Sequence, residues 1–216
     1  MDYTTLTGLK TVTGSIKEWV NDGTIPASVV LQEAEQMIFT ELRVREQKKL
    51  YSGTVASGNT TLDLDTVAPR FLEAISFRRA ADAAGRIFLR DEQYFEERLA
   101  TQSDGTLFAG CPTECCIDSD TIYFNVSTDQ TYYLRLWYFE RPAPLAASTN
   151  ETNFLTDKHP MLLRNACLAA AFDFKKDSAQ RDHHLKMMAS LIQQANVQAD
   201  IQKQAYDEDI YSEGAR

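Results

Sequence analysis

The spacing of apolar residues changes twice along this chain, and these changes constrain its fold more than any other feature. Near the N-terminus, and again after Pro160, apolar residues recur at steps of three and four, which predicts amphipathic helices at both ends. Between about Gln47 and Glu140, short apolar segments alternate with polar residues between Gly, Asn and Asp turns, which predicts β-strands. We therefore expect an α+β protein with a β-rich part inserted between two helical ends.

The N-terminal end is predicted to form a helical hairpin. Its first arm places on one face Leu9, Val12, Ile16, Trp19 and Val20. Asn21-Asp22-Gly23 ends this arm, although Gly8 and Gly14 weaken it. The second arm starts at Pro26 and repeats the apolar residues Val30, Ala34, Met37, Ile38 and Leu42.

Two strands near the end of the β-rich part are predicted to pair as a hairpin, residues 121–126 and 131–140 joined by residues 127–130. The second strand carries apolar side chains on both faces: Tyr132, Leu134, Leu136 and Tyr138 on one, and Tyr133, Trp137 and Phe139 on the other. We expect both faces to be covered. Earlier in the chain, residues 91–102 predict a short inserted helix that is capped by Asp91.

Helical spacing returns after Pro160. One stripe consists of Leu163, Cys167, Ala170 and Phe174, and a longer helix over residues 179–206 carries a second stripe of Leu185, Met188, Ile192, Ala195, Ala199 and Tyr206. Neither terminal segment can cover its own stripe, so the two ends should pack together. We expect residues 1–45 and 155–216 to form one discontinuous helical layer. Residues 46–154 should form a small antiparallel sandwich or barrel.

Composition narrows the range of partners. The chain has 22 Lys and Arg against 31 Asp and Glu, a net charge of −9, which argues against general affinity for nucleic acid or anionic lipid. No segment is apolar enough to span a membrane, and the polar start lacks a signal segment. We therefore expect a soluble intracellular protein with reduced cysteines.

The cysteines offer the main candidate for metal chemistry. Cys111, Cys115 and Cys116 would suit zinc if a fourth ligand joined them. Their spacing lacks the matched pairs of structural zinc sites, and Cys167 falls on a helical apolar stripe. We expect turn or core cysteines, with a small metal-binding protein or enzyme as the alternative function.

Motifs for catalysis are missing from the sequence. It contains no Gly-rich phosphate loop, no G-x-S-x-G and no H-E-x-x-H. His183 and His184 would point about 100° apart on a helix and cannot share a ligand; with His159, they are expected at the surface. We expect neither enzymatic activity nor a cofactor.

The acidic C-terminal segment is the main candidate for binding. Its apolar residues Tyr206, Ile210 and Tyr211 have helical spacing and stand among the carboxylates of Asp207, Glu208 and Asp209. One interpretation is a frayed, solvated tail. The other is a docking segment in which aromatic side chains supply contact area and the acidic residues select a basic groove.

Three strings, taken in order, resemble the head-to-tail adaptor (connector) proteins of tailed bacteriophages. The first, residues 25–43, has a Pro start, an Ala34-Glu35 pair and a Leu-Arg end. The second is the short strand at residues 61–65, which lacks a proline that many members have. The third consists of Tyr138-Phe-Glu-Arg-Pro-Ala-Pro-Leu145, Thr152-Asn-Phe-Leu155 and His159-Pro-Met-Leu-Leu163 before an alanine-rich helix. The likeness covers about Leu6 to Tyr211, but the cysteine cluster and the helix at 91–102 are not expected from it.

The resemblance implies a structural subunit without enzymatic activity, located in the neck of the virion and present in the host cytoplasm during assembly. Such subunits form a ring, commonly of twelve copies, that docks on the portal protein and meets a tail nozzle or stopper protein. DNA passes through the ring without specific binding, and no membrane is involved. The likeness makes Tyr206, Ile210 and Tyr211, with Asp207 and Asp209, candidate contacts to the portal.

Overall fold

A computed structural model describes most of the chain: residues 1–9, 13–80, 85–99, 105–147 and 149–213. Side chains are described for these residues except Arg98 and residues 202–213. No helix in the described part combines the length and apolar character that a membrane span requires.

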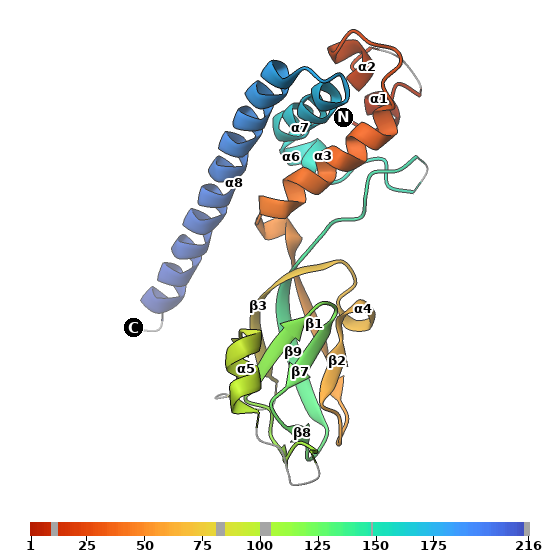
Figure 1. Cartoon of the computed structure of the whole chain (residues 1–216). Helices are drawn as coiled ribbons and strands as arrows, with labels where there is room; N and C mark the ends of the chain where they lie inside the picture. The colour runs from red at the N-terminus through yellow and green to blue at the C-terminus, as the bar shows by residue number, and fades with distance from the viewer. Residues whose placement is uncertain (10–12, 81–84, 100–104, 148, 214–216) are drawn as a thin grey trace. The chain divides into compact units, whose positions relative to one another are not determined.

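The chain divides into two compact units. Residues 1–46 and 142–216 form a helical unit, and residues 47–141 form a β unit. Helices dominate the first and strands the second (Figure 1). The predicted α+β class, with helical ends and a β insertion, is confirmed.

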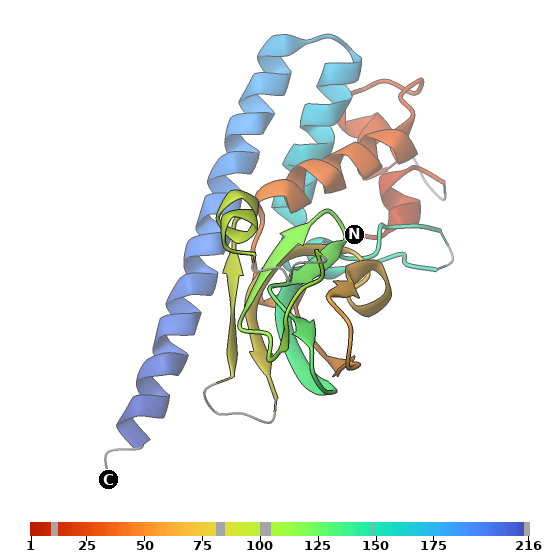
Figure 2. The same cartoon turned by 60° about the horizontal axis from the view of Figure 1, so that its bottom comes forward.

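The described part of the helical unit contains the α-helices α1 (Tyr3–Leu6), α2 (Ile16–Trp19), α3 (Ala27–Glu41), α6 (Phe154–Lys158), α7 (Pro160–Phe174) and α8 (Ser178–Glu213). The short 3₁₀-helix η1 (Arg45–Gln47) follows α3. α7 packs against both α3 and α8, and the long α8 lies alongside α7 in both views (Figures 1 and 2). The N- and C-terminal segments therefore share one core, as expected from their unpaired stripes.

The predicted apolar stripes account for most of this core. Buried positions include Val30, Ala34, Ile38, Leu42, Leu163, Cys167, Ala170, Met188, Ile192 and Ala195. Phe174 is an exception, because it is the last residue of α7 and its side chain is 57% exposed. Three helices are thus placed largely by their own sequence period.

The predicted first arm of the hairpin is wrong as a single helix. The chain forms the two four-residue helices α1 and α2 in that region. Gly8 and Gly14 between them have φ angles of 72° and 78°, in the left-handed region that a right-handed helix cannot contain. Leu9 is consequently 65% exposed, and Val12 lies outside the described residues.

The β unit is a curved, barrel-like sheet of seven strands in the order β1-β9-β3-β4-β6-β7-β2. The strands are β1 (Lys48–Val55), β2 (Thr61–Asp63), β3 (Phe71–Arg79), β4 (Arg86–Arg90), β6 (Glu114–Asp118), β7 (Thr121–Phe124) and β9 (Tyr132–Glu140), and β5 (Ala109–Gly110) pairs separately with β8 (Ser127–Thr128). Two helices accompany them, α4 (Leu64–Val67) and α5 (Glu92–Arg98). Pairing is antiparallel except between β4 and β6 and between β5 and β8, which are parallel.

The predicted hairpin between residues 121–126 and 131–140 is wrong. β7 pairs with β6 and β2, whereas β9 pairs with β1 and β3. The segment between β7 and β9 does not form a tight turn, because β8 pairs with β5 and the Thr128 hydroxyl donates a 2.6 Å hydrogen bond to the carbonyl of Ala56. The partners of β9 therefore come from distant parts of the chain.

The expectation that both faces of β9 are covered is also wrong. Leu134 and Leu136 are buried in the core of the β unit, but Tyr133 is 64% and Trp137 is 44% exposed. The sheet curves around its own core, so its inner face is filled while the outer face of β9 faces solvent. The predicted inserted helix is found as α5, which ends at Arg98, and Asp91 caps it by accepting a 2.9 Å hydrogen bond from the Tyr94 amide.

Candidate interaction surfaces

The side chain of Asn196 links the middle of α8 to the end of α3. Asn196 accepts a 2.8 Å hydrogen bond from the Arg43 amide and donates one of 3.0 Å to the carbonyl of Glu41. These backbone groups follow the last turn of α3, where helical partners run out. The apolar spacing of α8 gave no sign of this contact, which sequence reasoning missed.

Beyond Asn196, the predicted binding residues lie on the last part of α8. The backbone of α8 is helical through Glu213, past the predicted end near Tyr206. The side chains of Tyr206, Asp207, Asp209, Ile210 and Tyr211 lie outside the described residues, so their role stays a prediction. Before them, Val197 and Ile201 are 51% and 60% exposed, and α8 therefore presents apolar surface to solvent ahead of the acidic segment.

A buried carboxylate joins the strings that carry the family resemblance. Glu35 on α3 is 4% exposed and accepts hydrogen bonds from the Leu145 amide (3.2 Å) and the Asn153 side chain (3.0 Å). Asn153 also caps α6 by accepting hydrogen bonds from the amides of Leu155 and Thr156. The segment 142–153 is thus held in the helical unit, although we expected it in the β-rich part.

Burial also changes the acidity of this group. Removal from water raises the pKa of Glu35 above its usual value, and the hydrogen bonds from Leu145 and Asn153 only partly offset that rise. Glu35 stands between Leu31 and Phe39 at helical spacing, which is the signal in the sequence that could have identified a buried carboxylate.

A row of arginines crosses the outer face of the β unit. Arg135 on β9 lies directly opposite Arg78 on β3, and Arg78 lies directly opposite Arg86 on β4. The inner neighbours Leu136, Phe77 and Ile87 are buried, so the arginines point outward and all three are exposed. We call these three residues the arginine row.

Aromatic side chains surround the arginine row. Tyr133 and Trp137 stand two positions on either side of Arg135 on β9, and therefore share its outward face. On β4, the guanidinium groups of Arg86 and Arg90 both lie 5.3 Å from the centre of the Phe88 ring. The surface thus combines positive charge with exposed rings.

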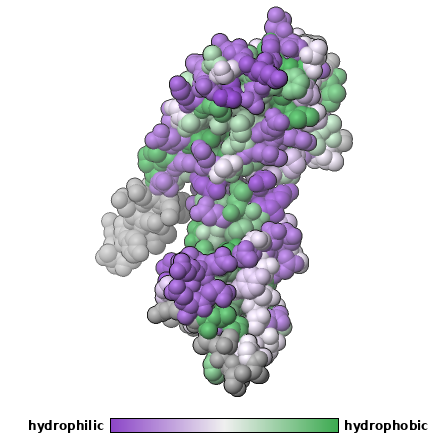
Figure 3. All heavy atoms as spheres, in the orientation of Figure 1, coloured by the Kyte–Doolittle hydropathy of each residue, from purple (hydrophilic) through white to green (hydrophobic). Residues whose placement is uncertain are grey.

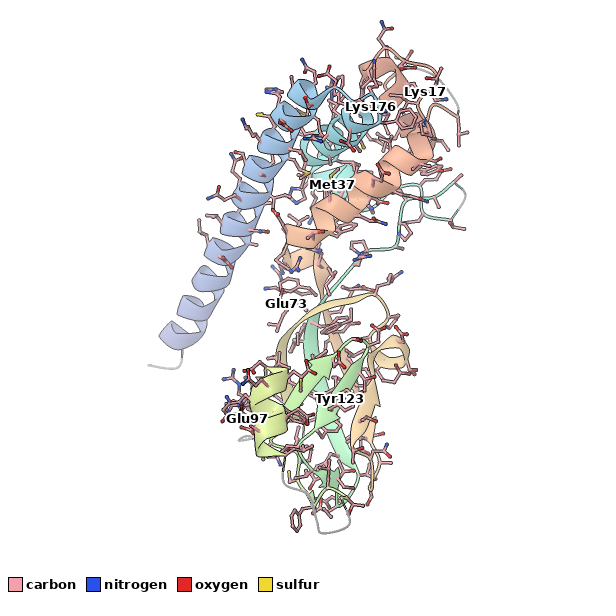
Figure 4. All side chains as sticks on the ribbon, in the orientation of Figure 1. Lys17, Met37, Glu73, Glu97, Tyr123 and Lys176 are labelled. Atoms are coloured by element: carbon pink, nitrogen blue, oxygen red, sulfur yellow. The ribbon has the colours of Figure 1, made fainter. Side chains whose placement is uncertain are left out.

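The neighbouring helix α5 has the opposite charge. α5 packs on β6 through the buried Phe95 and displays Glu92, Glu96 and Glu97 to solvent. Hydrophilic side chains gather over it in Figure 3, and Figure 4 labels Glu97 on its surface. Charge is therefore separated on this unit between the sheet face and α5.

The cysteine cluster does not assemble into a ligand set. Cys115 and Cys116 are neighbours on β6 and point to opposite faces; Cys115 lies in the core and Cys116 beneath α5. Burial raises the pKa of Cys115 to about 12 and also raises that of Cys116. Within the described residues, no group of three metal-binding side chains occurs.

The histidines are only partly where we expected them. His183 is exposed, whereas His159 and His184 are half-buried. The ring of His184 stacks on that of Phe172 with 5.6 Å between the ring centres. Its Nδ1 lies 3.0 Å from the side-chain oxygen of Asn165. Burial lowers the pKa of His184 and of His159, and both serve packing.

A family model described as SU10 adaptor protein matches residues 2–210. The chain therefore belongs to the SU10 adaptor protein family, in agreement with its resemblance to phage head-to-tail adaptors. No curated protein matches it. Membership indicates a structural adaptor of the phage virion neck and agrees with the expected lack of enzymatic activity.

Proposed function

We propose that this protein is the head-to-tail adaptor subunit of a tailed phage, and that twelve copies form a ring that joins the portal protein to a tail nozzle or stopper protein. The ring continues the channel through which DNA passes without specific binding. The observation that carries the proposal is the family match over residues 2–210. Assembly takes place in the host cytoplasm.

The portal contact is assigned to the acidic end of α8. Asn196 and the buried Ala195 hold the middle of the helix in the helical unit, and its backbone continues to Glu213. Tyr206, Ile210 and Tyr211 supply contact area, and Asp207 and Asp209 favour a basic or amide-rich groove on the portal.

Truncation tests this assignment. Removal of residues 205–216 should abolish co-sedimentation with purified portal while circular dichroism shows a folded protein. Tyr211→Ala should weaken docking by about 1 to 2 kcal/mol per subunit, and Ser212→Ala in the same segment serves as the matched control. Undiminished binding by the folded truncation would move the portal interface to another surface.

Assembly is proposed to depend on the portal. The net charge of −9 makes identical copies repel one another. Mass photometry of the free protein at micromolar concentration should therefore show monomers or small species, and a dominant stable dodecamer would contradict the proposal.

A further inference from the structure

We propose that the arginine row and its flanking aromatic side chains form a docking surface for the acidic face of α5 on a second copy of this chain. The inference rests on the ring proposed above and assigns its contact between subunits. It starts from the unusual arrangement of charge on the β unit.

The arginine row is unfavourable in an isolated chain. Like charges placed directly opposite each other on neighbouring strands repel, and strands lie about 4.8 Å apart. Within the described residues, no carboxylate forms an ion pair with Arg78, Arg86 or Arg135. An anionic partner from outside the chain would remove this repulsion.

The composition of the surface favours a protein as that partner. Arg, Trp and Tyr are the residue types most enriched among those that dominate protein–protein binding energy. Here Trp137, Tyr133 and the arginine row stand together on one face, with Trp137 44% and Tyr133 64% exposed. A DNA duplex would engage the guanidinium groups through its phosphates but would leave the rings of Trp137 and Tyr133 without partners.

α5 supplies the complementary charge. Glu92 and Glu96 are one helical turn apart, so their Cβ atoms are separated by about 5 to 6 Å. This spacing is close to the distance between neighbouring strands, and two carboxylates can therefore meet two adjacent arginines. Neither side-chain carboxylate accepts a hydrogen bond within the described residues, and both glutamates are exposed.

A contact between these two unlike surfaces can build a ring. Each bound copy leaves one arginine row and one α5 free at the ends, so further copies can add, and the assembly closes into a ring when the rotation between copies brings the ends together. The net charge of −9 opposes association while the local charges favour it. Salt screens both the repulsion from the net charge and the attraction between the local charges. Variants that exchange the charges of the two surfaces therefore separate the two effects better than a series of salt concentrations.

The test uses two full-length double variants with opposite charge changes. Arg78→Glu with Arg135→Glu makes both surfaces acidic, and Glu92→Lys with Glu96→Lys makes both basic. Sedimentation velocity at several hundred micromolar should show association of the natural protein. Each variant alone should need at least a tenfold higher concentration for the same association. An equimolar mixture should recover it, because every contact then joins unlike charges at the same average net charge.

Controls place equal charge changes elsewhere. Lys17→Glu with Lys186→Glu should leave association unchanged, as should Asp118→Lys at the end of β6 with Asp120→Lys on the turn that follows. Circular dichroism checks the fold of every variant.

The fluorescence of Trp137 reports the contact directly. The chain has two tryptophans, and Trp19→Phe leaves Trp137 as the remaining one. Its emission should shift to shorter wavelength as the copies associate.

Several outcomes would overturn the inference: a natural protein that stays monomeric at every concentration, a mixture that does not associate, or recovery with Asp118→Lys and Asp120→Lys instead of the α5 variant. A short DNA duplex that shifts Trp137 emission, and fails to do so in Arg78→Glu with Arg135→Glu, would assign the surface to DNA.

The proposed function can fail separately. Rings that form on the portal from both charge variants would leave the adaptor role intact and refute this contact. If the mixed variants associate but the natural protein does not bind portal, the contact between copies would stand and the adaptor role would be refuted.

Discussion

The helical unit and the β unit differ in how their cores are specified. In the helical unit, the apolar residues of α3, α7 and α8 repeat within each helix and fill one shared core. In the β unit, alternation along β9 identifies the inner side chains Leu134 and Leu136 but not the neighbouring strands, β1 and β3. The spacing of apolar residues within one element therefore determines which of its faces is buried, while the pairing of strands depends on contacts between distant segments.

The strongest test of this comparison is a matched pair of core truncations. Leu163→Ala in α7 and Leu136→Ala in β9 each remove a side chain that is 0% exposed, and each should lower the free energy of unfolding by about 2 to 5 kcal/mol. Hydrogen exchange read by mass spectrometry should show faster exchange mainly in the unit that carries the change. Equal acceleration in both units would show that they unfold as one.

A smaller effect is expected at Glu35, where the helical unit departs from a purely apolar core. Glu35→Ala leaves the Leu145 amide and the Asn153 side chain without their acceptor, and should cost about 2 kcal/mol by urea unfolding. The exposed Glu41→Gln is the control, with no expected change.

The same residue makes the helical unit sensitive to pH. Because the folded-state pKa of Glu35 is raised, its stabilising contribution is fully present below the unfolded pKa and is lost as the pH rises through the folded pKa. Glu35→Gln stays neutral, so the natural protein should gain stability relative to this variant as the pH falls through the raised pKa of Glu35 toward the ordinary glutamate value of 4.5. A constant difference would show that Glu35 is not desolvated in solution.

Asn196 should contribute less, because it links the middle of α8 to the end of α3 near solvent. Asn196→Ala removes the partners of the Arg43 amide and the Glu41 carbonyl, with an expected loss of about 1 kcal/mol. Thermal unfolding measures this loss. In the same measurement, Gln194→Ala at an exposed neighbouring position should leave the stability unchanged. If both changes cost the same, the contact between α3 and α8 is weaker than its geometry indicates.

Much of the helical unit could be predicted from sequence, because each stripe is contained within its helix. The first arm could not, since Gly8 and Gly14 allow a left-handed backbone without requiring it. Glu35 and Asn196 were missed because a polar residue on a helix does not show which distant amide or carbonyl it meets. The arginine row was missed because its members come from three strands whose register is set only in the folded sheet.

The smallest effect on stability is expected on the outer face of the β unit. Trp137→Ala should change the free energy of unfolding by less than about 0.5 kcal/mol, in contrast to its buried neighbour Leu136. Chemical denaturation of the two variants gives the comparison directly. A large loss for Trp137→Ala would mean that this side chain supports the fold and is not available to a partner.

The discontinuous helical unit has a consequence for the order of events during synthesis. Glu35 and its partner Leu145 are 110 positions apart in the chain, and at about 5 to 20 residues per second the ribosome needs roughly 6 to 20 seconds to connect them. By the end of that interval every strand of the β unit has been made, while the apolar face of α3 still has none of its α7 partners. The β unit can therefore complete its fold first, and α3, which precedes it in the sequence, is among the last helices to pack.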